Sequence, residues 1–216
     1  MNKENALTFE EFYDKVKTYI TDSNELEVIK KAYLYASKIH EGEKRLTEED
    51  YIIHPLNVAY ILTNIHSDYE TLSAALLHDV VKTDNVDIIE LEREFGSNIS
   101  NLVKEVNKIN KLSLSADSEY QINYYKKILV GLCEDVRVII IKLADRLHNM
   151  QTLWAIPEEK QKEKAKETLE ILAPIAHRLG IHYLKSELED ISLRYYKPDV
   201  YYDIVTRLNN NKVERD

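Results

Sequence analysis

The sequence predicts an all-α protein, and three observations support this prediction. Only four glycines and four prolines occur in 216 residues, which leaves few sites for the tight turns of a many-stranded fold. Apolar residues recur at the spacing of an amphipathic helix through most of the chain. No segment shows the strict alternation of apolar and polar residues that indicates a half-buried strand.

Composition and charge exclude several classes of protein. The net charge of −9 disfavours non-specific nucleic-acid binding, although local cations or a metal could still bind a small phosphorylated ligand. The glycines are too scattered for a P-loop or a dinucleotide-binding loop. No apolar run approaches the roughly 20 residues that cross a bilayer, and the N-terminus lacks a secretory signal pattern. With Cys133 as the single cysteine, we expect a cytoplasmic protein with no nucleic-acid or membrane partner.

Helix start and stop signals divide the first half of the chain. Thr8 and Glu11 have the spacing of a capping box, and Asp68 is a candidate N-cap. Pro55 stands at a first helical position, where its missing N–H costs no hydrogen bond. The expected helices cover residues 8–20, 22–40, 54–64, 69–81, 87–95 and 98–112.

The second half is expected to be helical as well. The expected helices cover residues 119–132, 136–154, 157–176, 182–196 and 199–208. Pro174 should kink the third of these, because proline cannot donate the hydrogen bond that continues a helix. The tail over residues 209–216 looks disordered or cut from a longer chain.

Residues 75–81, Ala-Leu-Leu-His-Asp-Val-Val, form the stretch around which the chemistry is organised. His78 and Asp79 end an apolar helix, where polar side chains need a partner, a metal or a ligand. His54 precedes them and Asp145 follows them, each on another apolar helix. Two imidazoles and two carboxylates are a suitable ligand set for one divalent metal.

Each of these residues also has a purely structural interpretation. His54 could cap a helix or lie hydrogen-bonded in a loop. Asp145 could form an ion pair with Arg146 or another cation. His78 and Asp79 could form a structural hydrogen bond with each other. These alternatives stay open when each residue is considered alone.

The expected helix over residues 136–154 is apolar nearly all round, which indicates that it is buried. Asp145, Asn149 and Thr152 lie at positions i, i+4 and i+7 and therefore share one face. A polar stripe on a buried helix must meet partners, a metal or a ligand. These three residues are therefore candidates for the functional site.

The order His…His-Asp…Asp is the signature of HD-type metal phosphohydrolases, and several longer motifs surround it. They are Lys-Arg at 44–45, Tyr-Ile-Ile-His-Pro at 51–55, Ala-Ala-Leu-Leu-His-Asp-Val-Val at 74–81, Ile-Lys-Leu-Ala-Asp-Arg-Leu-His-Asn-Met at 141–150, Leu-Ala-Pro-Ile-Ala-His-Arg-Leu-Gly-Ile at 172–181 and Leu-Glu-Asp-Ile-Ser-Leu-Arg-Tyr at 188–195. With these motifs, the chain from about residue 25 to 208 resembles the hydrolase domain of RelA/SpoT-type bifunctional alarmone enzymes. The last two motifs look like the long bifunctional members.

The resemblance implies a helical HD-domain metal phosphohydrolase that removes the 3′-pyrophosphate of ppGpp or pppGpp, the alarmones of the stringent response. It implies one Mn²⁺ as the cofactor. The positions that match the family's metal ligands are His54, His78, Asp79 and Asp145. The positions that match its nucleotide pocket are Arg45, which would stack on guanine, Thr47, Asn149 and Thr152. Lys44 could add charge for phosphates or be a solvated loop lysine.

Two departures from the family pattern bear on activity. The family's hydrolases usually read His-Asp-x-x-Glu-Asp, and those two acidic residues are thought to orient or activate the attacking water. Lys82 and Thr83 stand in their place here, and neither side chain can act as a carboxylate base. Residues 47–50, Thr-Glu-Glu-Asp, replace the family's Ser-Gly-Glu-Pro, and their acidic side chains disfavour an anionic ligand.

Three functional interpretations are open. The first is an alarmone hydrolase, whose four metal positions are all present. The second is a catalytically silent HD module that binds nucleotide and regulates a partner, for which Lys82 and Thr83 are the support. The third is an HD phosphohydrolase that acts on another nucleotide, for which the altered loop is the only hint.

We expect three parts in the chain. Residues 1–24 form a lead-in helix, residues 25–196 an HD hydrolase domain, and residues 197–216 a C-terminal helix and tail. In long relatives, this last part begins the linker toward a synthetase domain. The expected partners are guanosine tetraphosphate or pentaphosphate and, if the chain is a fragment, a synthetase domain.

Overall fold

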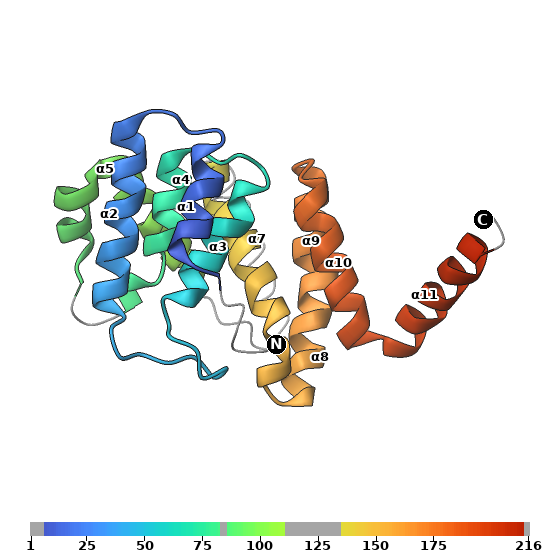
Figure 1. The fold of residues 1–216 in the computed structure, drawn as a ribbon. Helices are drawn as coiled ribbons and strands as arrows, with labels where there is room; N and C mark the ends of the chain where they lie inside the picture. The colour runs from blue at the N-terminus through green and yellow to red at the C-terminus, as the bar shows by residue number, and fades with distance from the viewer. Residues whose placement is uncertain (1–6, 83–85, 111–134, 214–216) are drawn as a thin grey trace. The chain divides into compact units, whose positions relative to one another are not determined.

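Nearly all the regular structure is helical in the computed structural model of the chain, which describes residues 7–82, 86–110 and 135–213 (Figure 1). Within these residues, the only β-type pairing is an isolated bridge between Lys44 and Asp50. The predicted all-α class is confirmed. None of the described helices is both long enough and apolar enough to cross a bilayer.

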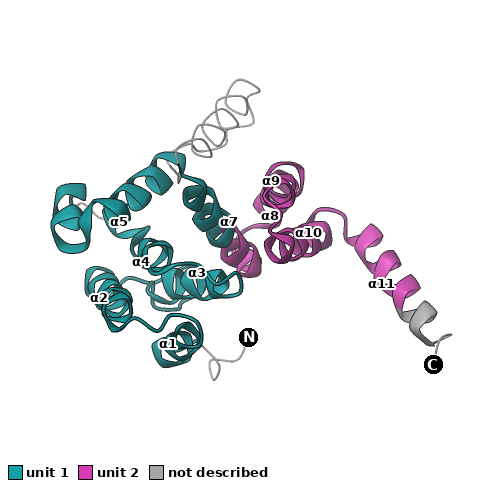
Figure 2. Cartoon of the chain, turned by 90° about the horizontal axis from the view of Figure 1, so that it is seen from above, with its two compact units in different colours: residues 1–145 teal, residues 146–216 magenta. Residues whose placement is uncertain are grey.

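The chain divides into two compact units, residues 1–145 and residues 146–216 (Figure 2). Helix α7 (Val136–Gln151) runs across the division in the sequence. The part boundaries expected near residues 24 and 196 stay a prediction. The helix expected over residues 119–132 lies outside the described residues.

Helix α4 is the central helix of the first unit. It spans Tyr69–Leu77, and the other described helices of this unit, besides the first ten residues of α7, are α1 (Phe9–Lys17), α2 (Ser23–Ile39), α3 (Ile53–Thr63), a 3₁₀ turn (Val80–Lys82) and α5 (Ile88–Asn110). Helix α4 packs against α2, α3 and α5, and every residue from Thr71 to Leu77 is buried. A helix that is apolar nearly all round is stable only in such a position. The residues that follow α4 therefore enter the core.

Polar caps mark several helix starts where the sequence predicts them. The Thr8 hydroxyl accepts a hydrogen bond from the Glu11 N–H, and the Thr8 backbone N–H donates to the Glu11 carboxylate in return. This is the expected capping box. Asp22 and Asp68 cap α2 and α4 through their side chains. Gly96, with φ of 82°, divides α5 into two helical segments, as the two expected helices require.

Two helix boundaries differ from the prediction. Helix α3 begins at Ile53, so Pro55 stands at its third position instead of its first. The reason is a turn that runs directly into the helix, in which the Ile53 N–H donates to the Asp50 carbonyl. Proline is still accommodated, because the first turn of a helix has no internal acceptors for its N–H groups. Helix α4 ends at Leu77, well before residue 81.

The second unit consists of helices joined by short connections. They are a 3₁₀ turn (Leu153–Ala155), α8 (Glu158–Glu167), a π-helical turn (Thr168–Leu172), α9 (Ala173–Arg178), α10 (His182–Tyr196) and α11 (Pro198–Val213). The π turn lies directly before Pro174, where the missing N–H leaves the Glu170 carbonyl without its helical partner. The expected interruption at Pro174 is therefore present. Helix α11 continues to Val213, so residues 209–213 are helical, contrary to the prediction of a disordered tail.

Candidate metal centre

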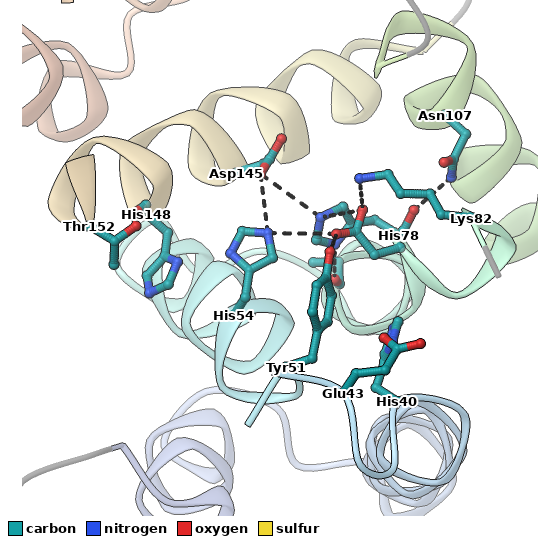
Figure 3. A network of polar contacts seen from close by, with 12 residues as sticks. His40, Glu43, Tyr51, His54, His78, Lys82, Asn107, Asp145, His148 and Thr152 are labelled. Carbon is teal, nitrogen blue, oxygen red and sulfur yellow. Dashed lines mark hydrogen bonds and ion pairs between the residues drawn. The ribbon is translucent and has the colours of Figure 1, made fainter. Parts of the chain in front are cut away.

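The three predicted residues His54, His78 and Asp145 converge in the core of the first unit (Figure 3). One ligand atom from each lies within 4.8 Å of the others, and all three side chains are buried. His54 comes from the second position of α3, His78 directly follows α4, and Asp145 lies on α7. Two consecutive helices and one that comes much later in the sequence therefore contribute to one cluster.

Asp79 joins this cluster through both of its carboxylate oxygens. Its Oδ1 lies 3.1 Å from Nε2 of His78, and its Oδ2 lies 3.9 Å from Nε2 of His54. The Oδ1 atom of Asp145 lies 3.3 Å from Nε2 of His54 and 3.9 Å from Nε2 of His78. The four side chains thus bring two ring nitrogens and two carboxylates close together at one point in the core, although Asp79 is not in the group of three whose ligand atoms all lie within 4.8 Å of one another.

The early end of α4 presents His78 and Asp79 to this point. In a continued helix, the His78 carbonyl would accept a hydrogen bond from the Lys82 N–H. That N–H donates to the backbone carbonyl of Asp79 instead. The side chain of Asn107 donates to the His78 carbonyl at 2.6 Å and takes the place of the lost partner. The helix can therefore end in the core without leaving this carbonyl unsatisfied.

The orientation of His78 makes its outer nitrogen a suitable metal ligand. Its Nδ1 lies 2.7 Å from the Ala75 carbonyl, which can only accept, so Nδ1 carries the hydrogen. In the neutral ring, Nε2 then has the free electron pair and faces the cluster. A hydrogen bond of this kind on the second ring nitrogen is typical of metal-binding histidines.

The protonation states in the cluster also suit a cation. Burial lowers the pKa of His54, which leaves its imidazole neutral at neutral pH. Burial opposes the ionisation of both aspartates, but nearby positive charge outweighs it. At Asp145 the largest charge effect comes from Lys142, and at Asp79 it comes from His78 and then Lys82. The pKa of each carboxyl group is therefore lowered. Neutral imidazoles and ionised carboxylates are the forms that bind metals.

Two buried atoms support the fit of a metal to this site. Nε2 of His78 and Oδ1 of Asp79 are both inaccessible, and neither has a hydrogen-bond partner among the described residues, although Oδ1 forms an ion pair with Lys82. Buried polar atoms are rarely left in this condition without a ligand or an ion to satisfy them. With two imidazole nitrogens and two carboxylates, the donor set suits a divalent transition metal. The cluster is therefore a divalent-metal site by its chemistry.

Tyr51 holds one oxygen of Asp79. Its hydroxyl donates to Oδ2 at 2.7 Å, and burial, together with the Asp79 charge, raises its pKa so that the proton stays on. The ring of His40 stacks on Tyr51 with centroids 4.5 Å apart, and Glu43 lies 2.7 Å from the His40 ring nitrogen Nδ1. The orientation of Asp79 is thus fixed by side chains from the loop before α3 and from the end of α2.

The loop after α2 carries three of the predicted nucleotide-binding residues. Arg45 and Thr47 are half-buried, and the Thr47 hydroxyl donates to Glu49. Lys44 is exposed and forms a 2.5 Å ion pair with Asp50. Glu48 occupies the position of the family's glycine and has a φ of 66°, so the departure places a strained residue in this loop.

The other two predicted nucleotide-binding residues belong to the second unit. Asn149 lies on the last turn of α7, and Thr152 follows the end of that helix. Both are half-buried. The Thr152 hydroxyl is 3.2 Å from the His148 carbonyl and 3.3 Å from the Asn149 carbonyl, so it contributes to ending the helix.

Sequence reasoning assigned no role to three residues of the centre, namely Tyr51, Asn107 and Lys142. A signal was present for two of them. Lys142 lies three residues before Asp145 on a helix, which is the spacing of an ion pair, and the two are 2.8 Å apart. Asn107 is a buried amide on the apolar side of α5, and such a group needs a partner. The structural alternative for Asp145, an ion pair with Arg146 or another cation, is present as the ion pair with Lys142, while Arg146 pairs with Glu167.

Curated relatives of this chain are much longer proteins. It is 44% identical over 195 residues to a protein of Myxococcus xanthus named GTP pyrophosphokinase, a match that covers 89% of this chain and 26% of that protein. It is 40% identical over 209 residues to the bifunctional (p)ppGpp synthase/hydrolase SpoT of Escherichia coli, which covers 95% and 30%. A guanosine-3′,5′-bis(diphosphate) 3′-pyrophosphohydrolase of Aquifex aeolicus is 42% identical over 201 residues, which covers 93% and 28%. The chain thus spans less than a third of each.

A solved structure and a family model agree with these similarities. A metazoan ortholog of SpoT that hydrolyzes ppGpp superposes with a TM-score of 0.60 at 28% identity, which covers 79% of this chain and 96% of that one. The family model described as HD domain matches residues 32–182, which contain all four residues of the candidate metal centre. The chain belongs to the HD-domain family.

Proposed function

We propose that this chain is a metal-dependent phosphohydrolase that removes the 3′-pyrophosphate of ppGpp or pppGpp. The observation that carries the proposal is the convergence of His54, His78 and Asp145 within 4.8 Å in a buried position. The names of the E. coli and A. aeolicus relatives, and the activity of the metazoan ortholog, support this substrate. Because the relatives are much longer, the activity of this chain needs its own test.

In this proposal, His54, His78, Asp79 and Asp145 hold one Mn²⁺. The metal supplies a bound water of lowered pKa and polarises a phosphoryl oxygen. The buried walls keep bulk water from the two carboxylates, since Asp79 and Asp145 are 2% and 4% exposed. Tyr51 keeps Asp79 in one orientation through its hydroxyl.

We assign the nucleotide to the positions that match the family's nucleotide pocket. The planar guanidinium of Arg45 is suited to stack on guanine. Thr47, Asn149 and Thr152 are assigned to polar contacts with the nucleotide. Lys44 is the weakest of these assignments, because its ion pair with Asp50 offsets the charge that it would offer to a phosphate.

A second candidate function is a nucleotide-binding HD module without catalysis. Lys82 favours it, because its ammonium lies 2.5 Å from Oδ1 of Asp79, at the position where the family's hydrolases carry a glutamate. A lysine cannot replace the carboxylate that orients or activates water. This chain would then bind an alarmone, or another nucleotide, without cleaving it.

Pyrophosphate release from ppGpp in the presence of Mn²⁺ separates the two functions. We expect release by the unmodified chain, loss of release in Asp79→Ala, and no change in Asp87→Ala, whose aspartate is exposed. Binding of ppGpp without release would contradict the hydrolase and establish the binding module. If the chain neither binds nor cleaves ppGpp, other nucleotides should be assayed instead.

The double variant Lys82→Glu, Thr83→Asp tests whether the missing carboxylates limit the reaction. General acid–base groups typically contribute about 10²–10⁴-fold, so a gain of this size in kcat is expected. The same kcat in the double variant, with Mn²⁺ and ppGpp both bound, would show that this chain does not need the two acidic residues.

A further inference from the structure

Lys82 contacts the same oxygen of Asp79 that faces the candidate metal centre. Its ammonium lies 2.5 Å from Oδ1, and that oxygen lies 3.1 Å from Nε2 of His78. The contact is an ion pair without hydrogen-bond geometry, since Oδ1 has no hydrogen-bond partner. The other oxygen, Oδ2, already accepts from Tyr51. A cation bound at Oδ1 therefore has to share this oxygen with the ammonium or displace it.

The second lysine of the centre behaves differently. Lys142 binds Oδ2 of Asp145, whereas Oδ1 of Asp145 is the oxygen nearest to His54. The ion pair of Lys142 is therefore formed with the other oxygen of its aspartate, not with the one that faces His54. The Lys142 side chain is also only 12% exposed, whereas that of Lys82 is 49% exposed. A metal at Oδ1 of Asp79 would therefore disrupt the ion pair of Lys82, and the exposed Lys82 side chain can move away from it.

We propose that Lys82 is a tethered cation that competes with the divalent metal for Oδ1 of Asp79 and, once displaced, binds a phosphate group of the ligand. This proposal rests on the proposed metal site. In it, the site's affinity for metal depends on whether an anion is present to receive the ammonium. Lys82 is then a binding residue in the position where the family's hydrolases place an acidic one.

The charges of the centre also lead to the expectation that metal binding depends on an anion. The carboxylates of Asp79 and Asp145 are paired with the ammonium groups of Lys82 and Lys142. A divalent metal adds two positive charges that no side chain of this set compensates. A phosphate anion beside the metal compensates them and gives the released ammonium a partner. Metal and anion should therefore bind cooperatively, and each should raise the affinity for the other by the same factor.

Titration of the full chain with Mn²⁺, followed by isothermal calorimetry, tests the proposal without any nucleotide. Three proteins are compared, the unmodified chain, Lys82→Met and Lys108→Met. Lys108 is the matched control, because it forms a 2.5 Å ion pair with Glu105 at the same spacing and is similarly exposed, but lies outside the candidate centre. Each titration is repeated with inorganic phosphate, which adds the anion without a nucleotide.

We expect Lys82→Met to bind Mn²⁺ about tenfold more tightly than the unmodified chain, and the control to be unchanged. Phosphate should tighten Mn²⁺ binding about tenfold in the unmodified chain and in Lys108→Met, but much less in Lys82→Met. Equal Mn²⁺ affinities in Lys82→Met and the unmodified chain, or an equal effect of phosphate, would overturn the proposal. So would the absence of Mn²⁺ binding in all three proteins.

The outcome is independent of catalysis. If the lysine effect is found but ppGpp is not cleaved, the metal-competition proposal stands and the hydrolase proposal fails. If ppGpp is cleaved but the lysine effect is absent, the hydrolase proposal stands and the metal-competition proposal fails. Thermal unfolding of Lys82→Met without metal checks its fold, and the half-exposed side chain predicts an unfolding temperature close to that of the unmodified chain.

Discussion

Asp79 shows how the orientation of a buried carboxylate depends on the residues around it. Its Oδ2 accepts from Tyr51, and its Oδ1 faces both His78 and Lys82. Because each oxygen has a different partner, the carboxylate cannot rotate without losing one of them. The orientation of this side chain is therefore set by Tyr51 on one side and by cations on the other.

Tyr51→Phe removes one hydroxyl and leaves the ring that stacks on His40. Loss of an outer-shell hydrogen bond typically weakens metal binding by 10- to 100-fold, so we expect Mn²⁺ affinity to fall by about tenfold. Calorimetric titration measures the change. Tyr35→Phe is the control, because the Tyr35 hydroxyl also donates to a carboxylate, Glu90, at 2.7 Å and lies outside the centre. Equal affinities for Tyr51→Phe and the unmodified chain would show that Asp79 holds its orientation unaided.

For single residues, the sequence predicted which side chains meet, but not which carboxylate oxygen each lysine contacts. His54, His78 and Asp145 were expected together, and they converge in the core. The motif does not reveal which oxygen each lysine takes, because that depends on rotamers set by the tertiary environment. Lys142 and Lys82 have the same three-residue spacing from their aspartates, yet they bind oxygens that face in different directions.

Helix α4 illustrates the same limit at the scale of the element. Apolar periodicity continues to residue 81, and the sequence therefore predicts a helix to that point. The helix ends at Leu77 because Asn107, from another helix, binds the His78 carbonyl. Caps such as Thr8 and Asp68 act within a few residues and can be predicted locally. A stop supplied from a distant segment cannot be predicted in this way.

Asn107→Ala tests the role of this distant stop. The substitution leaves the buried His78 carbonyl without its side-chain donor, which typically costs about 1–3 kcal/mol. Urea unfolding should show a loss of this size in the free energy of unfolding. Asn101→Ala, on an exposed face of the same helix, should change it by less than about 0.5 kcal/mol. If both variants are equally stable, the amide is not needed to end α4.

Arg137 connects the starts of two helices and gives the first unit a predicted pH dependence. It donates to Asp135, before α7, and to Glu70, on the first turn of α4. The hydrogen bonds of Arg137 lower the pKa of Asp135. Burial would raise the pKa of Glu70, but bonds from Asn98 and Arg137 outweigh it and lower that pKa as well. These carboxylates stabilise the fold above their ordinary pKa values of 3.8 and 4.5.

Arg137→Gln should therefore reduce stability at about pH 6, and this effect should shrink as the pH falls below the ordinary carboxyl values of 3.8 and 4.5. Both carboxyl groups gain protons as the pH falls through their lowered pKa values, so their contribution to the unmodified chain disappears there. Chemical unfolding across this range measures the difference between the two proteins. Arg93→Gln, whose arginine is 76% exposed and lies 3.9 Å from Glu94, is the control. A difference that is constant with pH would contradict the assigned role.

For the whole chain, a metal bound only to the folded state should raise the unfolding temperature. At a Mn²⁺ concentration 100 times the Kd, the added stability is about 2.7 kcal/mol, and a chelator should remove it. Asp145→Asn should abolish the Mn²⁺ response, whereas Asp14→Asn, at a site 73% exposed, should retain it. Thermal scans of the three proteins with and without Mn²⁺ make the comparison. An equal rise in Asp145→Asn would place the metal elsewhere.

The order of the proposed ligands along the chain has a consequence for biosynthesis. His54, His78 and Asp79 are made early, and Asp145 follows only after α5 and a further segment. At about 5–20 residues per second, translation takes roughly 3–13 seconds to pass from Asp79 to Asp145. Throughout that interval, three ligands exist without the fourth. The complete set of proposed ligands can therefore bind a metal only after Asp145 has been made.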